Sequence, residues 1–398
     1  GWHAKMCASQ ATQDLFHAAT RGDVQAAMLA LVGHAEPNSC NADGLTPLMV
    51  ATAGGHLEAA RLLVTGGTKV NATPCAWGLT PLSLAAAQGN LEIVSLLLQW
   101  KAEPTIAAHS GNAPLSRAAA MGHAQVCTLL LEFSADPDAI DDRGVTALME
   151  AIDRGHPEVA KLLLRSRFTV AAVDHRGRSA LSCASDALLR LEAHGTKLSS
   201  GLHDPISQYD TWSEILRHIA ALSADANVAD SDGETPLSKA VRERRKDVVV
   251  MLLTAGADKD HAVPALRGAT VLLRAAAQAD RDLVQFLLFQ NASVNRVSGD
   301  GESPIFAAAD TGREDLVFDL LKHGAEITRR DPASGETLIM RAAGRGLHRV
   351  YAHLLPLSAA SPVKPGGDVA AATSRSAAAT TCRTDEGFDD GTARSDAA

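Results

Sequence analysis

The sequence predicts an all-α solenoid of about ten helix-turn-helix repeats joined by β-hairpin-like loops. The first observation is a short phrase, Gly-x-Thr/Ser-Pro-Leu, that recurs along the chain at steps of 33 to 35 residues. The second is the composition, because hydrophobic residues make up 46% of the chain but aromatic residues only 4%. A core of Leu, Ala and Val suits closely packed helices, and 398 residues are ample to bury such a core.

The recurring phrase sets the register of the repeats. It begins at Gly44, Gly78, Gly111, Gly144, Gly177, Gly233, Gly268, Gly301 and Gly335. Seven of the eight steps between its Thr-equivalent positions span 33 to 35 residues, whereas the step from Ser179 to Thr235 spans 56. The long step predicts one repeat that carries an insertion of about two dozen residues, at about 186–210.

Each part of the phrase has a physical role in a helical hairpin. Thr or Ser caps a helix by accepting a backbone N–H, and Pro follows at a position where the helix needs no donor. The next residues, such as 82–86, offer small side chains that let neighbouring helices approach closely. A second glycine, such as Gly89, then ends this first helix because glycine tolerates the left-handed conformation. A leucine run such as 96–98 predicts the second helix.

In this pattern the chain resembles the ankyrin-repeat family over residues 14–355. A degenerate first unit at 14–38 is typical of an N-terminal cap, so we expect residues 1–13 to be an N-terminal extension. Residues 356–398 are rich in Ala, Ser, Thr, Gly and Asp and are expected to be a disordered low-complexity tail. The family's His after Thr-Pro-Leu is absent throughout, and Met, Ser, Leu or Phe takes its place.

Composition and motifs argue against catalysis and against nucleic-acid binding. The net charge of −9 gives no global basic field, and no apolar run reaches the length of about 18 residues that suggests a membrane span. The six cysteines form no C-x-x-C pair, which indicates reduced thiols in an intracellular, cytoplasmic protein, with a nuclear location left open. No phosphate-binding loop, metalloprotease motif or hydrolase motif is present. We therefore expect no enzyme activity, cofactor, metal site or small-molecule substrate, and we expect a monomer.

The resemblance implies a scaffold or adaptor that binds another protein on a concave surface of hairpin tips and first helices. Self-alignment places a locally basic group at such positions in repeats four to six, and a Trp at the third hairpin tip is a candidate anchor. The predicted partner-binding residues are Trp77, Arg117, Arg143, Arg154, His175, Arg176 and Arg178. Repeat nine carries an acidic group, Asp300, Glu302 and Asp310. We expect a polarised surface on which an acidic protein segment docks at repeats four to six.

Three questions stay open at this point. Ankyrin repeats resemble substrates of asparaginyl hydroxylase, which favours a Leu eight residues before the Asn, and Asn71 and Asn295 fit that spacing. The insertion is either a partner-specific element or a tolerated surface loop. The chain starts with Gly1 instead of Met, which motivates an alternative reading as a targeting or regulatory segment of a larger enzyme, channel or ubiquitin ligase.

Overall fold

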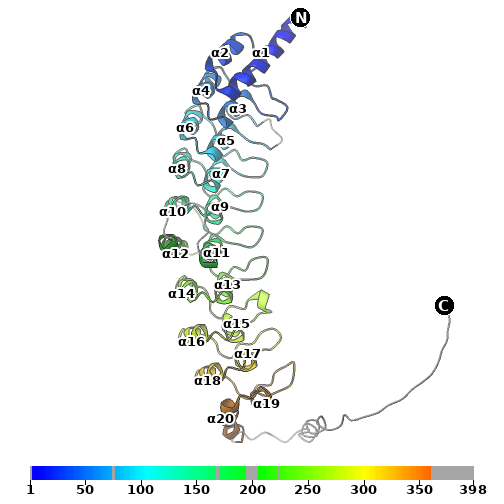
Figure 1. The fold of residues 1–398 in the computed structure, drawn as a ribbon, viewed down its shortest axis with the longest axis vertical. Helices are drawn as coiled ribbons and strands as arrows, with labels where there is room; N and C mark the ends of the chain where they lie inside the picture. Colours follow the sequence, from blue (N-terminus) through cyan, green and yellow to red (C-terminus); the bar gives the residue numbers. More distant parts are fainter. Residues whose placement is uncertain (1, 74–76, 167–169, 194–204, 223–224, 360–398) are drawn as a thin grey trace, which may run out of the picture. The chain divides into compact units, whose positions relative to one another are not determined.

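The computed structural model describes residues 2–73, 77–166, 170–193, 205–222 and 225–359. Contacts divide the chain into two units, Gly1–Val350 and Tyr351–Ala398. In the first unit, helical hairpins stack on one another, and a loop connects each hairpin to the next (Figure 1). The described residues contain no strand, but four isolated antiparallel bridges close hairpin loops, for example Ile140 with Thr146 and Val173 with Ser179. The all-α repeat architecture predicted from the sequence is confirmed.

Each repeat contributes a first and a second helix. The first helices are α1 (Trp2–Arg21), α3 (Pro47–Ala53), α5 (Pro81–Gln88), α7 (Pro114–Ala120), α9 (Ala147–Asp153), α11 (Ala180–Ala193), α13 (Pro236–Arg242), α15 (Val271–Ala277), α17 (Pro304–Asp310) and α19 (Leu338–Gly344). The second helices are α2 (Val24–Val32), α4 (Leu57–Thr65), α6 (Leu91–Gln99), α8 (Ala124–Glu132), α10 (Pro157–Arg165), α12 (Pro205–Ala221), α14 (Lys246–Thr254), α16 (Arg281–Phe289), α18 (Glu314–Lys322) and α20 (His348–Ala359). A short 3-10 helix, η1 (Pro264–Leu266), lies in one hairpin loop.

The first unit has three layers: the hairpin loops, the first helices and the second helices (Figure 1). The leucine of the recurring phrase forms the core between the helical layers, and Leu48, Leu82, Leu115 and Leu148 are all at most 1% exposed. Small residues of the first helices, such as Ala85, are buried between neighbouring repeats. We call the surface formed by the hairpin tips and the exposed side of the first helices the hairpin face. No helix in the described part of the chain is both long and apolar enough to cross a bilayer.

The capping chemistry expected from the phrase is present at Thr46, Thr80, Thr146 and Thr235, whereas Thr270, Ser303 and Thr337 make no side-chain cap bond. The hydroxyl of Thr46 accepts the backbone N–H of Met49, and the hydroxyl of Thr80 accepts that of Ser83. The Ser83 hydroxyl in turn accepts the backbone N–H of Thr80, which completes a capping box, and Ser238 forms the same box in α13. Serine at the position of the family's missing His therefore supports its helix locally.

Histidines interlock neighbouring repeats at a different position, directly after the second glycine. The Nε2 atom of His156 lies 3.0 Å from the carbonyl oxygen of Ala120 in the preceding repeat, and His123 is placed in the same way against Ala87. The His156 ring packs so closely on the second glycine of the preceding repeat, Gly122, that a Cβ on Gly122 would lie 2.6 Å from His156 Nδ1. These histidines are structural, and no group of His, Cys, Asp and Glu among the described side chains could hold a metal ion.

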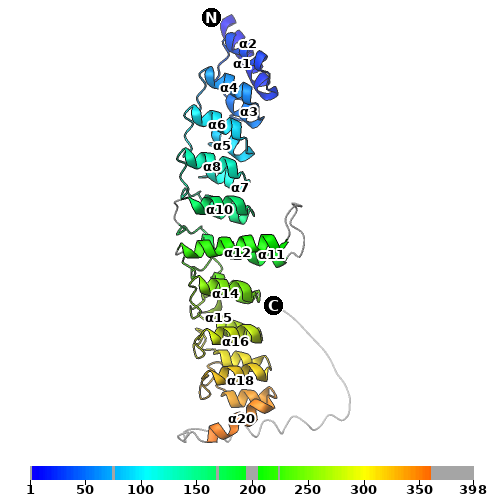
Figure 2. The same ribbon diagram turned by 90° about the vertical axis from the view of Figure 1, so that its left-hand side faces the viewer.

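The structure differs from the sequence reading at three boundaries. Helix α1 runs without a break through residue 13, where an extension was expected to end. Residues 186–193 of the expected insertion extend α11, and α12 begins at Pro205, also inside the expected insertion, so both helices are longer than their counterparts and project from the stack (Figure 2). Pro205 starts a helix because the first helical position needs no N–H donor. The rest of the insertion, 194–204, and the tail after 359 lie outside the described residues.

Candidate partner-binding surface

Backbone hydrogen bonds join the hairpin tips of successive repeats. The carbonyl oxygen of Trp77 accepts the N–H of His109 at 2.9 Å, and the carbonyl oxygen of Arg143 accepts the N–H of His175 at 2.8 Å. The carbonyl oxygen of Arg176 accepts the N–H of Ser231 in the same way. Four predicted binding residues therefore sit in a series of linked tips, which keeps their backbones at fixed positions along the hairpin face.

An aspartate inside each of two tips holds the local backbone. Asp174 Oδ1 accepts the N–H groups of Arg176 at 2.9 Å and Arg178 at 2.8 Å. Asp141 Oδ1 plays the same part in the preceding repeat, where it accepts the N–H groups of Arg143 and Val145. These loops are short Asx-type turns with little freedom, so the side chains that they present are well positioned before any partner binds.

Five of the seven predicted residues gather around one pocket between repeats five and six. The pocket has a volume of about 260 Å³, and Arg143, Arg154, His175, Arg176 and Arg178 line it. Glu150, Asp153 and Asp174 line it as well, so four arginines face three carboxylates. The self-alignment thus brought together residues that the structure also brings together.

Ion pairs neutralise most of this basic group. Arg143 lies 2.7 Å from the buried carboxylate of Asp141, and Arg178 lies 2.9 Å from both Asp153 and Asp174. Burial would lower the pKa of Arg178, but Cys183 together with Asp153 and Asp174 outweighs burial and raises it. Carboxylates of the same molecule therefore neutralise three arginines of the predicted set: Arg143, Arg178 and the more loosely paired Arg154.

Four predicted residues are not engaged in this way. His175 and Arg176 are exposed, and their side chains form no hydrogen bond or ion pair with a described residue. Trp77 is 71% exposed at its tip. Arg117 is half-buried on α7, outside the pocket of repeats five and six, and also lacks a partner among the described residues. Fewer of the predicted side chains are therefore free to bind a partner than the sequence suggested.

The acidic group of repeat nine is partly neutralised as well. Asp300 pairs with Arg267 at 2.7 Å, and Asp310 pairs with Arg341 at 3.0 Å. Glu302 has no such partner, and burial together with Asp310 raises its pKa. The strong polarity expected along the hairpin face is thus reduced at both ends by internal pairing.

The two asparagines proposed as hydroxylation sites bridge repeats. Asn71 Oδ1 accepts the N–H of Glu103 at 2.9 Å, and its Nδ2 donates to the carbonyl of Lys101 at 3.3 Å. Asn295 makes the equivalent pair of bonds to Glu326 and Gly324. A modifying enzyme must break these bonds to reach either side chain, which makes both sites dependent on local opening.

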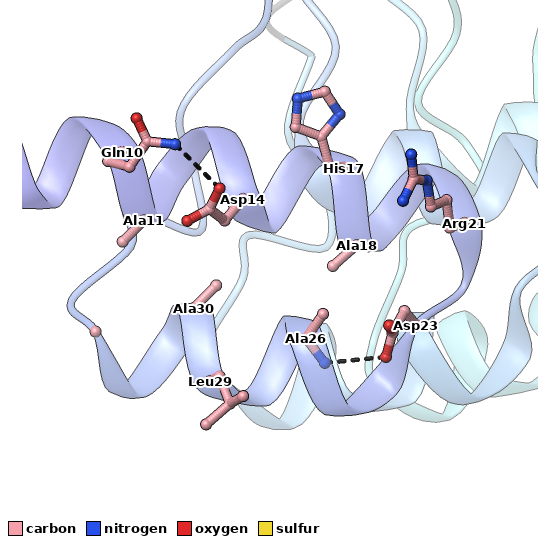
Figure 3. Close-up of a pocket in the computed structure, with 11 residues that line it drawn as sticks. Gln10, Ala11, Asp14, His17, Ala18, Arg21, Asp23, Ala26, Leu29 and Ala30 are labelled. Atoms are coloured by element: carbon pink, nitrogen blue, oxygen red, sulfur yellow. Dashed lines mark hydrogen bonds between the residues drawn. The ribbon is translucent and has the colours of Figure 1, made fainter.

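A larger hollow of about 620 Å³ lies between α1 and α2 and contains none of the predicted residues (Figure 3). Its polar groups serve the two helices: Gln10 donates to Asp14 at 3.1 Å, and Asp23 caps α2 by accepting the N–H of Ala26. Small alanines line much of the rest. The hollow carries no constellation suited to catalysis.

Sequence reasoning missed two of the carboxylates that hold the arginines. Asp141 and Asp174 stand at the same loop position of successive repeats, nine residues before the helix position of Glu150 and Cys183. This register was visible in the self-alignment. Arg190 was also missed: it lies on the extended part of α11 and contacts Asp153 at 3.4 Å.

Family profiles match most of the chain. A profile for ankyrin repeats in three copies matches residues 15–108, 101–174 and 272–364, and a profile for a single ankyrin repeat matches residues 232–262. The chain belongs to the ankyrin-repeat family. Ankyrin repeats are modules that bind other proteins, and proteins of this family are typically non-catalytic.

Individual relatives match shorter stretches of the ankyrin-repeat chain. The B-cell lymphoma 3 protein homolog of Mus musculus is 35% identical over 104 residues, which are 26% of this chain and 23% of the relative. Neurogenic locus notch homolog protein 1 of Homo sapiens is 34% identical over 114 residues, 28% of this chain and 4% of the relative. The Neurogenic locus Notch protein of Drosophila melanogaster is 32% identical over 147 residues, 36% and 5% respectively. The matches thus span less than a quarter of each of these relatives.

Proposed function

We propose that this chain is a protein-interaction scaffold or adaptor whose hairpin face binds a segment of another protein. The observation that carries the proposal is the series of linked, rigid hairpin tips beside a pocket that five predicted residues line. A pre-organised surface binds without the cost of ordering its own loops. The proposal includes a monomeric, intracellular protein.

We further propose that an acidic part of the partner lies at repeats four to six. Support comes from the side chains that remain unpaired there, above all the exposed Arg176 and the adjacent His175. Complementary charge at such positions speeds association and sets the orientation of the partner more than it increases affinity. Trp77 offers an exposed aromatic surface at the tip of repeat three for an apolar part of the same segment.

The test compares two charge reversals in repeat six by affinity capture from cells. Arg176→Glu changes an exposed, unpaired residue of the hairpin face, whereas Arg217→Glu changes an exposed residue of the second helix α12. Both variants alter the net charge equally. We expect partners to be lost with Arg176→Glu and kept with Arg217→Glu. Identical partner sets for both variants would reject docking at the pocket of repeats five and six.

Reversal of Arg143 or Arg178 would be a poor test of binding. Arg178 is 16% exposed and lies against the carboxylate of Asp174, which is 3% exposed. A glutamate there would face a buried carboxylate and disturb the fold, so any loss of partner would have two explanations.

One observation favours the alternative that the chain is a targeting or regulatory segment. Its matches cover 4% of the Notch homolog of Homo sapiens and 5% of the Drosophila melanogaster Notch protein, so similar repeats form a small part of far longer proteins. A full-length transcript that joins these repeats to an enzyme, channel or ubiquitin ligase domain would decide for this alternative. A transcript that ends without such a domain would leave the scaffold.

A further inference from the structure

One position of the first helices, four residues after the Thr-equivalent, carries a basic side chain in four repeats. In three of them, carboxylates of the same molecule hold it. The pairs are Lys239 with Asp230 (2.7 Å), Arg274 with Glu234 (2.7 Å) and Arg341 with Asp310 (3.0 Å). These three cations are largely buried, with side chains 11 to 13% exposed, so their pairing satisfies groups that water does not reach.

Arg117 is the fourth basic residue at this position and has no carboxylate. Its Nε atom is buried without a hydrogen-bond partner, and no ion pair is formed with any described residue. Burial lowers the pKa of Arg117, and no neighbouring acid opposes that effect. A guanidinium presents five N–H donors in a fixed fork, and desolvating it without a partner costs free energy.

The sequence of the adjacent turns explains the missing acid. Asp230 stands nine residues before Lys239, and the residue at that position in repeat four is Ala108. Asp186, which also pairs with Lys239, lies on the first helix of the preceding repeat, where the equivalent residue is Ala87. Both positions that supply a carboxylate to Lys239 are alanines around Arg117.

Two exposed apolar side chains belong to the same two repeats. Met121, the C-cap residue of α7, is 54% exposed, and Trp77 at the preceding hairpin tip is 71% exposed. Leu84 holds the same helix position in repeat three and is half-buried, and Glu150, which pairs with Arg143 and Arg154, holds it in repeat five. A positive charge in repeats that also present exposed apolar side chains is suited to an acidic residue with apolar neighbours.

We propose that Arg117 is the docking point for one carboxylate of the partner, from an Asp or Glu side chain in a segment that crosses repeats three and four. The carboxylate is held as Glu234 is held by Arg274, through two parallel N–H···O hydrogen bonds. Trp77 and Met121 contact the apolar neighbours of that acid. This inference rests on the proposed function, since it names the chemistry that the hairpin face recognises.

The sharpest test leaves Arg117 unchanged and introduces the missing carboxylate by a substitution at position 108 of the same chain. In Ala108→Asp the new carboxylate accepts N–H groups of its own turn, as Asp174 does, and forms an ion pair with the Arg117 guanidinium, which is then no longer available to a partner. Ala108→Asn provides the same turn bonds, as Asn41 does in repeat two, but carries no charge. The two variants differ only in the charge offered to Arg117. Arg117→Gln completes the set, and Arg61→Gln, 53% exposed on α4, controls for removal of one positive charge.

The probe is a set of fluorescent peptide pools with a fixed central Asp, Glu, Asn, Gln or phosphoserine and randomised flanks, titrated into the full chain. We expect the Asp and Glu pools to bind wild type, Ala108→Asn and Arg61→Gln alike. Their binding should weaken about 10- to 100-fold in Ala108→Asp and Arg117→Gln, as expected for loss of a charge-assisted pair.

Three results would overturn the inference. An acidic preference that survives in Arg117→Gln would place the docking point elsewhere, and a much stronger preference for phosphoserine would replace the carboxylate with a phosphate. If all pools bound equally well, the carboxylate inference would fail while the hairpin face would remain a binding surface, so the two proposals can be told apart.

Discussion

Two arginines at the same helix position should respond oppositely to the same substitution. Arg274→Gln removes two hydrogen bonds of 2.7 Å and leaves the carboxylate of Glu234, whose side chain is 8% exposed, without its main partner. Removal of one member of a buried ion pair costs about 3–5 kcal/mol. Ser238 still donates to Glu234, so we expect the lower end, about 3 kcal/mol.

Arg117→Gln, in contrast, removes no hydrogen bond and no ion pair. We expect its stability to lie within about 0.5 kcal/mol of wild type, on the stabilising side, because an unpaired and half-buried charge is lost. The assay is urea unfolding at neutral pH, combined with hydrogen exchange of individual helices. Because each repeat contacts only its neighbours, the Arg274→Gln effect should concentrate in α13 and α15.

The pH dependence gives an independent check. Burial would raise the pKa of Glu234, but hydrogen bonds from Arg274 and Ser238 outweigh burial, so the pKa lies below its ordinary value of 4.5. A lowered pKa in the folded state adds stability that is complete above the ordinary value and is lost as the pH falls through the lowered value. The penalty of Arg274→Gln should therefore shrink in acid. Equal stability losses in both variants, or a penalty that does not change with pH, would refute the reasoning.

Three further predictions concern packing, thiols and modification. Gly122→Ala should lower the free energy of unfolding by about 2–3 kcal/mol, because φ is +79° and the new Cβ meets His156. Gly155→Ala, with φ of +78° and open space around the new Cβ, should lower it by about 1 kcal/mol. Equal losses in thermal or urea unfolding would contradict the packing of His156 on Gly122. Burial raises the pKa of Cys127 to about 12 and also raises that of Cys183. Iodoacetamide at pH 8 should therefore label the exposed Cys40 in the native protein but neither buried thiol. Prompt labelling of Cys127 or Cys183 would show that the core is open to solvent. Mass spectrometry of protein from cells should find one added oxygen on Asn71 or Asn295, and more of it after local destabilisation, since both amides bridge repeats; absence of the modification in every sample would dismiss it.

Local signals made the repeat predictable from the sequence. Thr80, Pro81 and Gly89 each act within one or two turns of their own helix, so their roles follow from the phrase alone. The period of the phrase then fixes which residues reach the hairpin face. That is why self-alignment found five side chains that line one pocket.

The state of those side chains was not predictable in the same way. Whether an arginine is free depends on a carboxylate in a neighbouring loop or repeat, as Asp153 shows for Arg178 and Ala108 shows for Arg117. Predicting such an ion pair requires the relative positions of two segments in space, which the order of charged residues along the sequence does not give. The start of α12 was missed for a related reason, because Pro205 signals a turn as readily as a first helical residue.

The most direct test of the hairpin face as the binding surface is site-specific photo-crosslinking in cells. A benzophenone amino acid at position 77 or 176 probes the hairpin tips, and one at 133 or 217 probes exposed positions at the second helices. We predict that one partner crosslinks from positions 77 and 176 and not from 133 or 217. Crosslinks to that partner from 133 or 217, with none from the tips, would contradict the account.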